Sequence, residues 1–352
     1  MSRDRQRQVV ASYARESCDA FLTYNVSNIR YLCGWTAEGV LLVTKDSLSL
    51  CVNPLYFNEA KAMLSDDVAV VKLGDEPFKQ IAALIKKSGA KMCALDNSSE
   101  LTLRRFNAIK EKSAAHNIAV KPLCGIVEKI RAKKSASELM SMRKAIAISQ
   151  ACYDALAPIF TPGTPEKTVR IAAETYLKLQ ADLSLAFDPI VASGKNAASP
   201  HYTAQDGIFG KNTAVLFDQG CKVDGYCSDL TRMFVIGKMP ARFHEIESAV
   251  LRSIDAAIKS VKPGVKCSAV DAAARGVIEK AGYGKYFVHG SGHGVGLDVH
   301  EYPSVSAKSD AILEAGMVIT IEPGIYLPGK YAFRQEHMVL VTSKGPEVLD
   351  EI

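Results

Sequence analysis

The sequence lacks the segments that direct a chain into or across a membrane. No stretch approaches the 18 or more uninterrupted apolar residues that a membrane-spanning helix needs. The N-terminus, MSRDRQRQVV, is charged and has no apolar core of the kind that a signal peptide carries. We therefore expect no membrane partner and a cytoplasmic location.

The nine cysteines contain no CxxC pair and no regular spacing. This pattern predicts free thiols in a reducing cytoplasm, because metal-binding and disulfide-rich domains show characteristic cysteine spacings. Cys221 and Cys227 lie between two aspartates, Asp218 and Asp229. Thiolate ligation of a metal is conceivable there, but we interpret both cysteines as small buried side chains.

Signatures of nucleotide and nucleic-acid binding are also missing. Neither a GxGxxG nor a GxxxxGK[ST] motif follows a predicted strand, and the net charge is only +5. The densest basic run, KIRAKK at 129–134, is short, and we interpret it as a solvated linker or helix start. A nucleic-acid-binding face needs clustered basic residues, so we expect no nucleic-acid partner.

The length of 352 residues favours two domains. Residues 1–128 alternate short apolar strands with helical segments and predict a small α/β domain. Residues 129–352 segregate helices from strands, which is typical of the α+β class. Helices are expected over 165–181, 241–261 and 267–281, and another is expected after an N-cap at Ser137. Each half of this second domain has helices followed by strands, a coarse internal repeat.

Acidic residues occur where apolar segments of the second domain end. NTAVLF precedes Asp218, and Asp229 follows eleven residues later. Strand alternation places Asp218 on the face of Ala214 and Leu216, and Glu322 on the face of Val318 and Thr320; in a third strand, Arg334, Glu336, Met338 and Leu340 share a face. A buried carboxylate needs a positive partner. Arg334 is the one basic residue in these strands, so a metal is the better explanation.

The ligand types suggest which metals fit. Carboxylates with one or two imidazoles, here from HGSGHGVGLDVHEYP, suit a hard or borderline divalent cation. Four carboxylates can balance two such ions, and two neighbouring metals are a common hydrolytic device. The glycines of this segment, at 290, 292, 294 and 296, are expected to let the backbone pass close beside the metals.

Five segments in order resemble the successive motifs of the Xaa-Pro peptidases, prolidase and aminopeptidase P, within the pita-bread metallopeptidases. They are FDPIVASGKNAASPHY, DQGCKVDGYCSDLTR, HGSGHGVGLDVHEYP, AGMVITIEPGIYLPG and FRQEHMVLVT. The resemblance covers about residues 130–352, with a looser match at YNVSNIRYLCGW. It implies a C-terminal pita-bread catalytic domain and a smaller N-terminal domain of the creatinase/prolidase type.

The resemblance also implies the site. The family's ligands for two divalent ions, most often Mn²⁺ with Co²⁺ or Zn²⁺ as alternatives, fall on Asp218, Asp229, His293, Glu322 and Glu336. Asp229 and Glu336 would bridge the ions, and Glu322 would also carry protons. The family's substrate-side residues fall on His201, His289, His300 and Arg334. For His289, packing of the glycine-rich loop is the alternative.

The activity implied is removal of the N-terminal residue from small peptides with proline in second position, by attack of a metal-bridging hydroxide. The proline preference comes from the resemblance alone. The family also implies a homodimer, with Trp35 near the rim of the partner's active site. Alternatives are a methionine-aminopeptidase-like exopeptidase, a non-catalytic pita-bread binding module and a metal-independent creatinase-like hydrolase. The retained Arg334 and five intact ligands count against them.

The sequence departs from the family in three places. Gln219 follows the first aspartate where an apolar residue is usual, and Gln335 and His337 flank Glu336 where the family has an apolar residue and an aspartate. Ser304 stands where some prolidases have a carboxylate-binding arginine, which favours an aminopeptidase P-like enzyme. Because Gln219 and Gln335 are expected on the face opposite the metals, we predict that they bond to each other or through one shared polar group, with His337 as a third member. The alternative is that this face is exposed to solvent and that the glutamines are independent.

Overall fold

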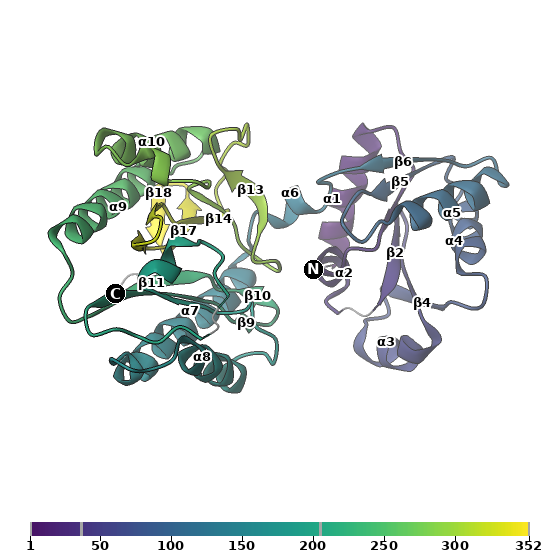
Figure 1. Ribbon diagram of the computed structural model, residues 1–352. Coiled ribbons are helices and arrows are strands. Elements are labelled where there is room, and N and C mark those ends of the chain that lie inside the picture. The colour runs from purple at the N-terminus through teal and green to yellow at the C-terminus, as the bar shows by residue number, and fades with distance from the viewer. Residues whose placement is uncertain (1, 36–37, 204–205, 351–352) are drawn as a thin grey trace. The chain divides into compact units, whose positions relative to one another are not determined.

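The computed structural model describes residues 2–35, 38–203 and 206–350 (Figure 1). It divides into two compact units, residues 1–131 and 132–352, so the division falls three residues beyond the expected boundary at 128/129. The short helix α6 (Glu128–Arg131) belongs to the first unit. It does so because Val127 is fully buried and the Glu128 carboxylate accepts a hydrogen bond from Asn28 of the same unit, at 2.7 Å.

The first unit contains a six-stranded mixed sheet in the order β4-β3-β2-β1-β5-β6. Its strands are β1 (Ala20–Thr23), β2 (Gly39–Thr44), β3 (Leu48–Val52), β4 (Val68–Lys72), β5 (Met92–Asp96) and β6 (Ala119–Leu123). Its other helices are α1 (Ser2–Arg15), α2 (Val26–Cys33), α3 (Phe57–Met63), α4 (Pro77–Lys87) and α5 (Leu103–Ala114), with a 3₁₀ turn at Pro54–Tyr56. This is the small α/β domain that the sequence predicts.

Both faces of this sheet are covered. Helices α4 and α5 lie on one side and α1 and α2 on the other (Figure 1). Ala20 and Leu22 of β1 pack with Ile81 and Ile85 of α4, while Phe21 on the opposite face is equally buried. A strand buried on both faces reads as a continuous apolar run, which explains segments such as GVLLVT.

Over its described residues, the second unit has two helix pairs, two larger antiparallel sheets and two short two-stranded ribbons. Its helices are α7 (Ala136–Leu156), α8 (Glu166–Gln180), α9 (Ala241–Ser260) and α10 (Cys267–Lys280), with 3₁₀ turns at Ala157–Ile159, Gly194–Ala198 and Gly284–Tyr286. Its strands are β7 (Ile190–Ser193), β8 (Thr213–Gln219), β9 (Lys222–Val223), β10 (Tyr226–Cys227), β11 (Leu230–Ile236), β12 (Gly292–Gly294), β13 (Glu301–Val305), β14 (Val318–Ile321), β15 (Gly324–Leu327), β16 (Tyr331–Arg334), β17 (His337–Thr342) and β18 (Gly345–Val348).

The two halves of this unit repeat one order of elements. Helices α7 and α8 precede the sheet β11-β8-β7, and helices α9 and α10 precede the sheet β13-β12-β14-β17-β18. Short ribbons β9-β10 and β15-β16 complete the two halves. One apolar core joins α9 and α10 to the second sheet, and another joins α7 and α8 to the first. This α+β arrangement, with helices outside and strands inside, turns the inner strand faces toward a common centre (Figure 1).

Two local expectations are wrong. Ser135, not Ser137, caps α7, because its hydroxyl accepts from the Glu138 N–H while the Glu138 carboxylate accepts from the Ser135 N–H at 2.7 Å. This reciprocal pair satisfies two backbone donors, which Ser137 cannot do from inside the helix. Glu336 does not continue a strand from Arg334, since β16 ends at Arg334 and β17 begins at His337.

The basic run at 129–134 is in part the short helix α6, which agrees with the expected helix start, but it is not fully solvated. The Arg131 and Lys134 side chains are buried. The Lys134 ammonium lies 2.6 Å from the Glu301 carboxylate, and both side chains are 1% exposed. Glu301 directly follows His300, so this lysine supports the segment that carries a candidate catalytic histidine. None of the helices within the described ranges is long and apolar enough to cross a membrane.

Asp96, at the end of β5, is a buried acid of the first unit. Its carboxylate accepts hydrogen bonds from Thr23 Oγ1 at 2.5 Å and from Asn28 Nδ2 at 2.9 Å. Burial, together with the nearby negative charge of Glu128, raises the pKa of Asp96 from 3.8 to about 6. The protonated carboxyl is therefore favoured in the folded chain, and its stabilising effect disappears as pH rises through about 6.

We expect Asp96→Asn to stabilise the first unit more at pH 7.5 than at pH 4.5. The amide keeps both hydrogen-bond acceptor contacts without a buried charge, and the difference between the two pH values should be about 2 kcal/mol. Urea unfolding followed by fluorescence measures it, because Trp35 is the single tryptophan. The exposed Asp46→Asn is the control, and equal effects of Asp96→Asn at both pH values would contradict the prediction.

Candidate metal centre

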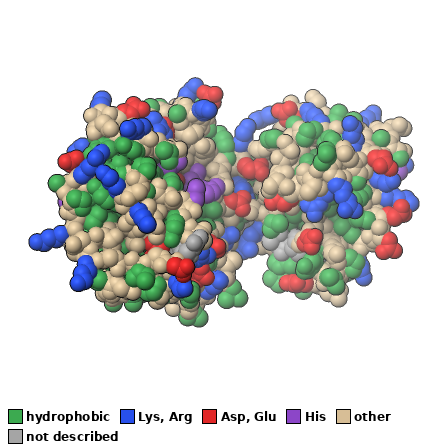
Figure 2. Space-filling model, viewed as in Figure 1, with side chains coloured by type: hydrophobic (Ala, Val, Ile, Leu, Met, Phe, Trp, Pro, Cys, Tyr) green, Lys and Arg blue, Asp and Glu red, His purple; other side chains and the backbone are tan. Residues whose placement is uncertain are grey.

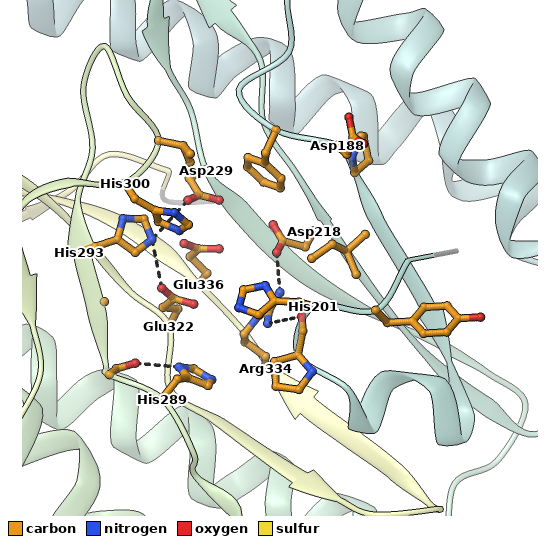
Figure 3. A pocket seen from close by; sticks show the side chains of 18 of the residues that line it. Asp188, His201, Asp218, Asp229, His289, His293, His300, Glu322, Arg334 and Glu336 are labelled. Atoms are coloured by element: carbon orange, nitrogen blue, oxygen red, sulfur yellow. Dashed lines mark hydrogen bonds and ion pairs between the residues drawn. The ribbon is translucent and has the colours of Figure 1, made fainter. Parts of the chain in front are cut away.

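A cavity of about 540 Å³ in the second unit collects the residues that the sequence singles out (Figure 3). All nine candidate residues line it: His201, Asp218, Asp229, His289, His293, His300, Glu322, Arg334 and Glu336. Figure 2 shows histidine side chains gathered at the surface of the same unit. Cys221 and Cys227 are buried and do not line this cavity, and all nine cysteines of the chain are free thiols.

The acids reach the cavity from the ends of strands. Asp218 is the second-last residue of β8, and Asp229 directly precedes β11, the strand that pairs with β8. Glu322 directly follows β14, and Glu336 directly precedes β17, which pairs with β14. Each half of the unit thus contributes two acids from one antiparallel strand pair. His293 comes from β12 of the second sheet.

Three overlapping groups hold ligand atoms within 4.8 Å of one another. They are Asp218 with Asp229 and Glu336, His293 with Glu322 and Glu336, and Asp229 with His293 and His300. The groups share Asp229, His293 and Glu336, so the five expected ligands form one continuous cluster. His300 also has a ring nitrogen close enough to take part, although the family resemblance does not assign it to a metal.

Burial and mutual repulsion make three of the four acids hard to ionise. Burial and the Asp218 charge raise the pKa of Asp229, and burial and the Asp229 charge raise that of Glu336. Burial raises the pKa of Asp218 to about 6 despite the Arg334 guanidinium, whose Nη2 lies 2.5 Å from Asp218 Oδ2. The other oxygen, Asp218 Oδ1, is buried without a hydrogen-bond partner. The protein therefore does not place enough positive charge near these three carboxylates to stabilise their ionised forms.

His293 forms ion pairs with two of the expected acidic ligands, Glu322 and Asp229. His293 Nε2 lies 3.2 Å from Glu322 Oε1 and 3.5 Å from Asp229 Oδ2. Burial would lower the pKa of His293, but its hydrogen bond to Glu322 and the two negative charges raise it to about 9. Burial alone would raise the pKa of Glu322, but His293 lowers it to about 2. In the metal-free chain a proton on His293 supplies charge that a cation would otherwise supply.

The donor set fits divalent cations. The cavity holds four carboxylates, one imidazole and one buried arginine, and one carboxylate oxygen, Asp218 Oδ1, has no hydrogen-bond partner. This is the oxygen-rich environment that Mn²⁺ and similar ions prefer. Without such ions the excess negative charge is offset only by bound protons. Two divalent ions would supply as many positive charges as the four carboxylates supply negative ones, and the protons would become unnecessary.

The three substrate-side histidines occupy different environments. His289 donates from Nδ1 to the Gly290 carbonyl at 2.7 Å, so its Nε2 accepts from the Tyr326 hydroxyl at 2.8 Å. Burial lowers the pKa of His289, which keeps this ring neutral. The rings of His293 and His300 lie edge to face with centroids 4.2 Å apart, and burial lowers the pKa of His300. His201 is exposed at the cavity.

Several supporting residues were missed by sequence reasoning. Thr231 donates from Oγ1 to Glu336 Oε2 at 2.9 Å and accepts from Arg334 Nε at 3.1 Å. Tyr326 accepts from Arg334 Nη1 at 3.1 Å and so links this arginine to His289. Strand alternation from Asp229 points to Thr231, two residues on, as a side chain on the same face as this acid. No local pattern indicates Tyr326.

A buried acid on α10 holds the glycine-rich segment. Asp271 accepts from the N–H of Ser291 at 3.0 Å and from its hydroxyl at 2.8 Å, while Arg275 pairs with Asp271 and donates to the His289 carbonyl at 2.8 Å. The glycines here permit close packing between strands. A Cβ at Gly292 would lie 2.0 Å from the Thr320 carbonyl oxygen, and one at Gly294 would lie 2.4 Å from that of Tyr302. These two glycines therefore allow close packing of neighbouring backbone, and Gly292 also lines the cavity as expected.

The predicted glutamine pair is wrong. Gln219 donates from Nε2 to the Ser149 carbonyl of α7 at 2.9 Å. Gln335 does contact His337, with 3.1 Å between its Nε2 and the ring Nε2. The two glutamines do not meet because β8 and β17 belong to different sheets, and the residue opposite Gln219 is Leu230 of β11.

We expect metal binding to this centre to release protons. The raised pKa values of His293, Asp229 and Glu336 mean that a cation must displace their protons, so affinity should fall as pH falls from 8 to 6. Calorimetric titration with Mn²⁺ at pH 7 in buffers of different ionisation enthalpy measures the protons released. A binding heat independent of the buffer would contradict the expectation.

Comparison with known proteins agrees with this geometry. The model of metallopeptidase family M24 matches residues 140–343, and that of the creatinase/prolidase N-terminal domain matches residues 5–133. An Xaa-Pro dipeptidase of Pyrococcus horikoshii is 33% identical over 349 residues, which cover 98% of this chain and 96% of that protein.

Solved structures agree over the full length. That of an Xaa-Pro dipeptidase from Bacillus anthracis has a TM-score of 0.94 at 30% identity, over 100% of this chain and 98% of the other. That of an X-Pro aminopeptidase from Thermotoga maritima has a TM-score of 0.85 at 30% identity, over 97% and 98%. The chain therefore belongs to metallopeptidase family M24, with a creatinase/prolidase N-terminal domain joined to a pita-bread catalytic domain.

Proposed function

We propose that this chain is a metal-dependent Xaa-Pro peptidase that removes the N-terminal residue from small peptides with proline in second position. The observation that carries the proposal is the cluster of four carboxylates and His293 around one cavity, with a buried carboxylate oxygen that has no protein partner. The similarity to an Xaa-Pro dipeptidase and an X-Pro aminopeptidase over nearly the whole chain supports the substrate class.

Asp218, Asp229, His293, Glu322 and Glu336 would hold two divalent ions. Mn²⁺ is our first choice, with Co²⁺ and Zn²⁺ as alternatives. When bound, the ions lower the pKa of a water molecule and so supply a nucleophile at neutral pH. Arg334 fixes one oxygen of Asp218 and leaves the other directed to a ligand.

The protein side chains then handle protons and developing charge. Glu322 Oε1 already accepts a hydrogen bond from the His293 ring, and we assign this carboxylate the role of carrying the proton to the leaving nitrogen. His201 and His300 line the cavity as donors for the oxyanion of the tetrahedral intermediate. Neutral His289 is held through Tyr326 and packs the glycine-rich segment, so we assign it an orienting role.

The wall of the cavity suits a proline ring. Phe187, Pro189, Ile190 and Val299 line it beside the acids. A bond to proline has no N–H, so a proline-selective site must recognise an apolar ring in place of a backbone donor. An apolar wall beside the candidate centre provides that recognition.

The cavity also favours peptides longer than a dipeptide. Among the lining residues that the structure describes, the arginines are Arg334, bound to Asp218, and Arg170, bound to Glu174 and Asp188. Ser304, where some prolidases have an arginine, bonds instead to Ser306. A dipeptide carboxylate would thus find no unpaired arginine on these walls, so the activity is closer to that of aminopeptidase P.

We further propose a cytoplasmic homodimer. The N-terminal domain has no site of its own that we assign, and Trp35 is our candidate for a residue near the partner's active site. Light scattering at working concentration tests the oligomeric state, and a fully active monomer would contradict the proposed homodimer.

Glu336→Gln should abolish turnover and leave folding intact. The amide cannot supply a negative charge to two cations, whereas it keeps its acceptor contact with Thr231. Hydrolysis of Ala-Pro-Ala with added Mn²⁺ and a thermal melt measure the two effects, and the exposed Glu347→Gln is the matched control. Substantial residual activity would show that the reaction does not depend on this centre.

Peptide length provides a second test. We expect the wild-type chain to cleave Ala-Pro-Ala faster than Ala-Pro and to leave Met-Ala largely intact. Ser304→Arg should raise kcat/KM for Ala-Pro relative to Ala-Pro-Ala, because it adds a partner for the dipeptide carboxylate, whereas Ser304→Gln adds bulk without charge and should not. A wild-type preference for Ala-Pro would instead favour a strict dipeptidase.

A further inference from the structure

The segment around Asp350 folds back against the strand that follows Glu336. The Leu349 N–H donates to the Met338 carbonyl at 2.8 Å, and Gln150 of α7 donates to the Asp350 carbonyl at 3.3 Å. The Asp350 side chain is fully buried. A fully buried carboxylate is costly unless it is paired and hydrogen-bonded, so its partners indicate why it lies there.

Every hydrogen-bond partner of the Asp350 carboxylate lies next to a residue of the candidate centre. Its Oδ2 accepts from Arg232 Nη2 at 2.6 Å and lies 3.0 Å from His337 Nδ1, and its Oδ1 accepts from the Met338 N–H at 2.9 Å. His337 and Met338 are the two residues directly after Glu336. The Asp350 carboxylate therefore binds the guanidinium of Arg232 and two successive residues of β17.

The same partners hold the two acids that we expect to bridge the ions. Arg232 Nη1 donates to the Glu336 carbonyl at 2.6 Å. The Met338 sulfur accepts from the Asp229 N–H at 3.3 Å. The backbones of Glu336 and Asp229 thus each lie one contact away from a group that Asp350 fixes.

The family resemblance of the sequence implies an aspartate at the position where this chain has His337. We propose that Asp350 is a positioning residue for Glu336, and that it supplies from a distant segment the carboxylate that the resemblance implies directly after the last ligand. The proposal rests on the assignment of Glu336 as a metal ligand. It explains how His337 is tolerated beside the centre: the histidine and the arginine share one carboxylate.

According to the proposal, the carboxylate that pairs with Arg232 can stand at position 350 or at position 337. Asp350→Asn leaves Arg232 buried without a negative partner. His337→Asp alone places two carboxylates beside one guanidinium. Each single change should therefore weaken the support of Glu336, whereas the double variant again has one carboxylate for one arginine. His337→Asn combined with Asp350→Asn is the matched control, because it resembles the double variant in size but lacks the carboxylate.

The experiment measures Mn²⁺ affinity by calorimetry at a temperature where the proteins are folded, together with thermal melts of the metal-free chains. We expect Asp350→Asn to weaken Mn²⁺ binding by about tenfold or more, as loss of groups that orient ligands commonly does. The double variant His337→Asp/Asp350→Asn should return to within about threefold of wild type, and the asparagine control should not. The exposed Asp310→Asn should change neither quantity.

Unchanged Mn²⁺ affinity in Asp350→Asn, or a double variant no better than that single variant, would overturn the proposal. If Asp350→Asn does not fold, recovery of a cooperative melt in the double variant but not in the asparagine control supports it, and recovery in neither overturns it. Failure of the proposed function would appear in the wild-type chain, as absent Mn²⁺ binding or peptidase activity, whereas failure of this inference would appear only in the variants.

Discussion

Four carboxylates brought within reach of one another in a buried cavity are the constraint on which the catalytic unit depends. Each carries a desolvation cost, and each raises the cost of ionising the next. The chain offsets this locally, with Arg334 on Asp218, Thr231 on Glu336 and His293 on Glu322. These contacts do not neutralise all the negative charge of the cluster, and the remaining negative charge favours the binding of cations.

The two halves of the unit hold their histidine-bearing segments in the same way. In the first half, buried Glu166 of α8 accepts from the N–H and the hydroxyl of Ser193, at 2.7 and 2.8 Å. In the second half, Asp271 of α10 does the same for Ser291. Each serine precedes a glycine in the segment that leads to a cavity histidine, His201 or His293. A helix acid thus fixes a serine-glycine pair in each half, directly before the segment that carries the histidine.

Support for the centre also comes from parts of the chain that are remote in sequence. Lys134, from the basic run at the start of the unit, holds Glu301 next to His300, and Asp350 holds the residues after Glu336. A buried ion pair is strongly destabilised when one partner is removed, because the other charge is left uncompensated. Residues at both ends of this unit are thereby tied to the geometry of its middle.

The sequence by itself determined the two-domain organisation, the α/β and α+β classes, the family and the residues that line the cavity. It could do so because these features are local: β2 is a six-residue apolar run, the expected helices over 241–261 and 267–281 differ from α9 and α10 by one residue, and the family motifs are contiguous. Only the tertiary structure decided that Gln219 bonds to α7, that Lys134 is buried, and that Asp350 binds Arg232. Strand alternation tells which face a side chain occupies, but not which strand or helix lies opposite it. The partner of a buried polar group is set by how the sheets pack, and a local pattern carries no information about that.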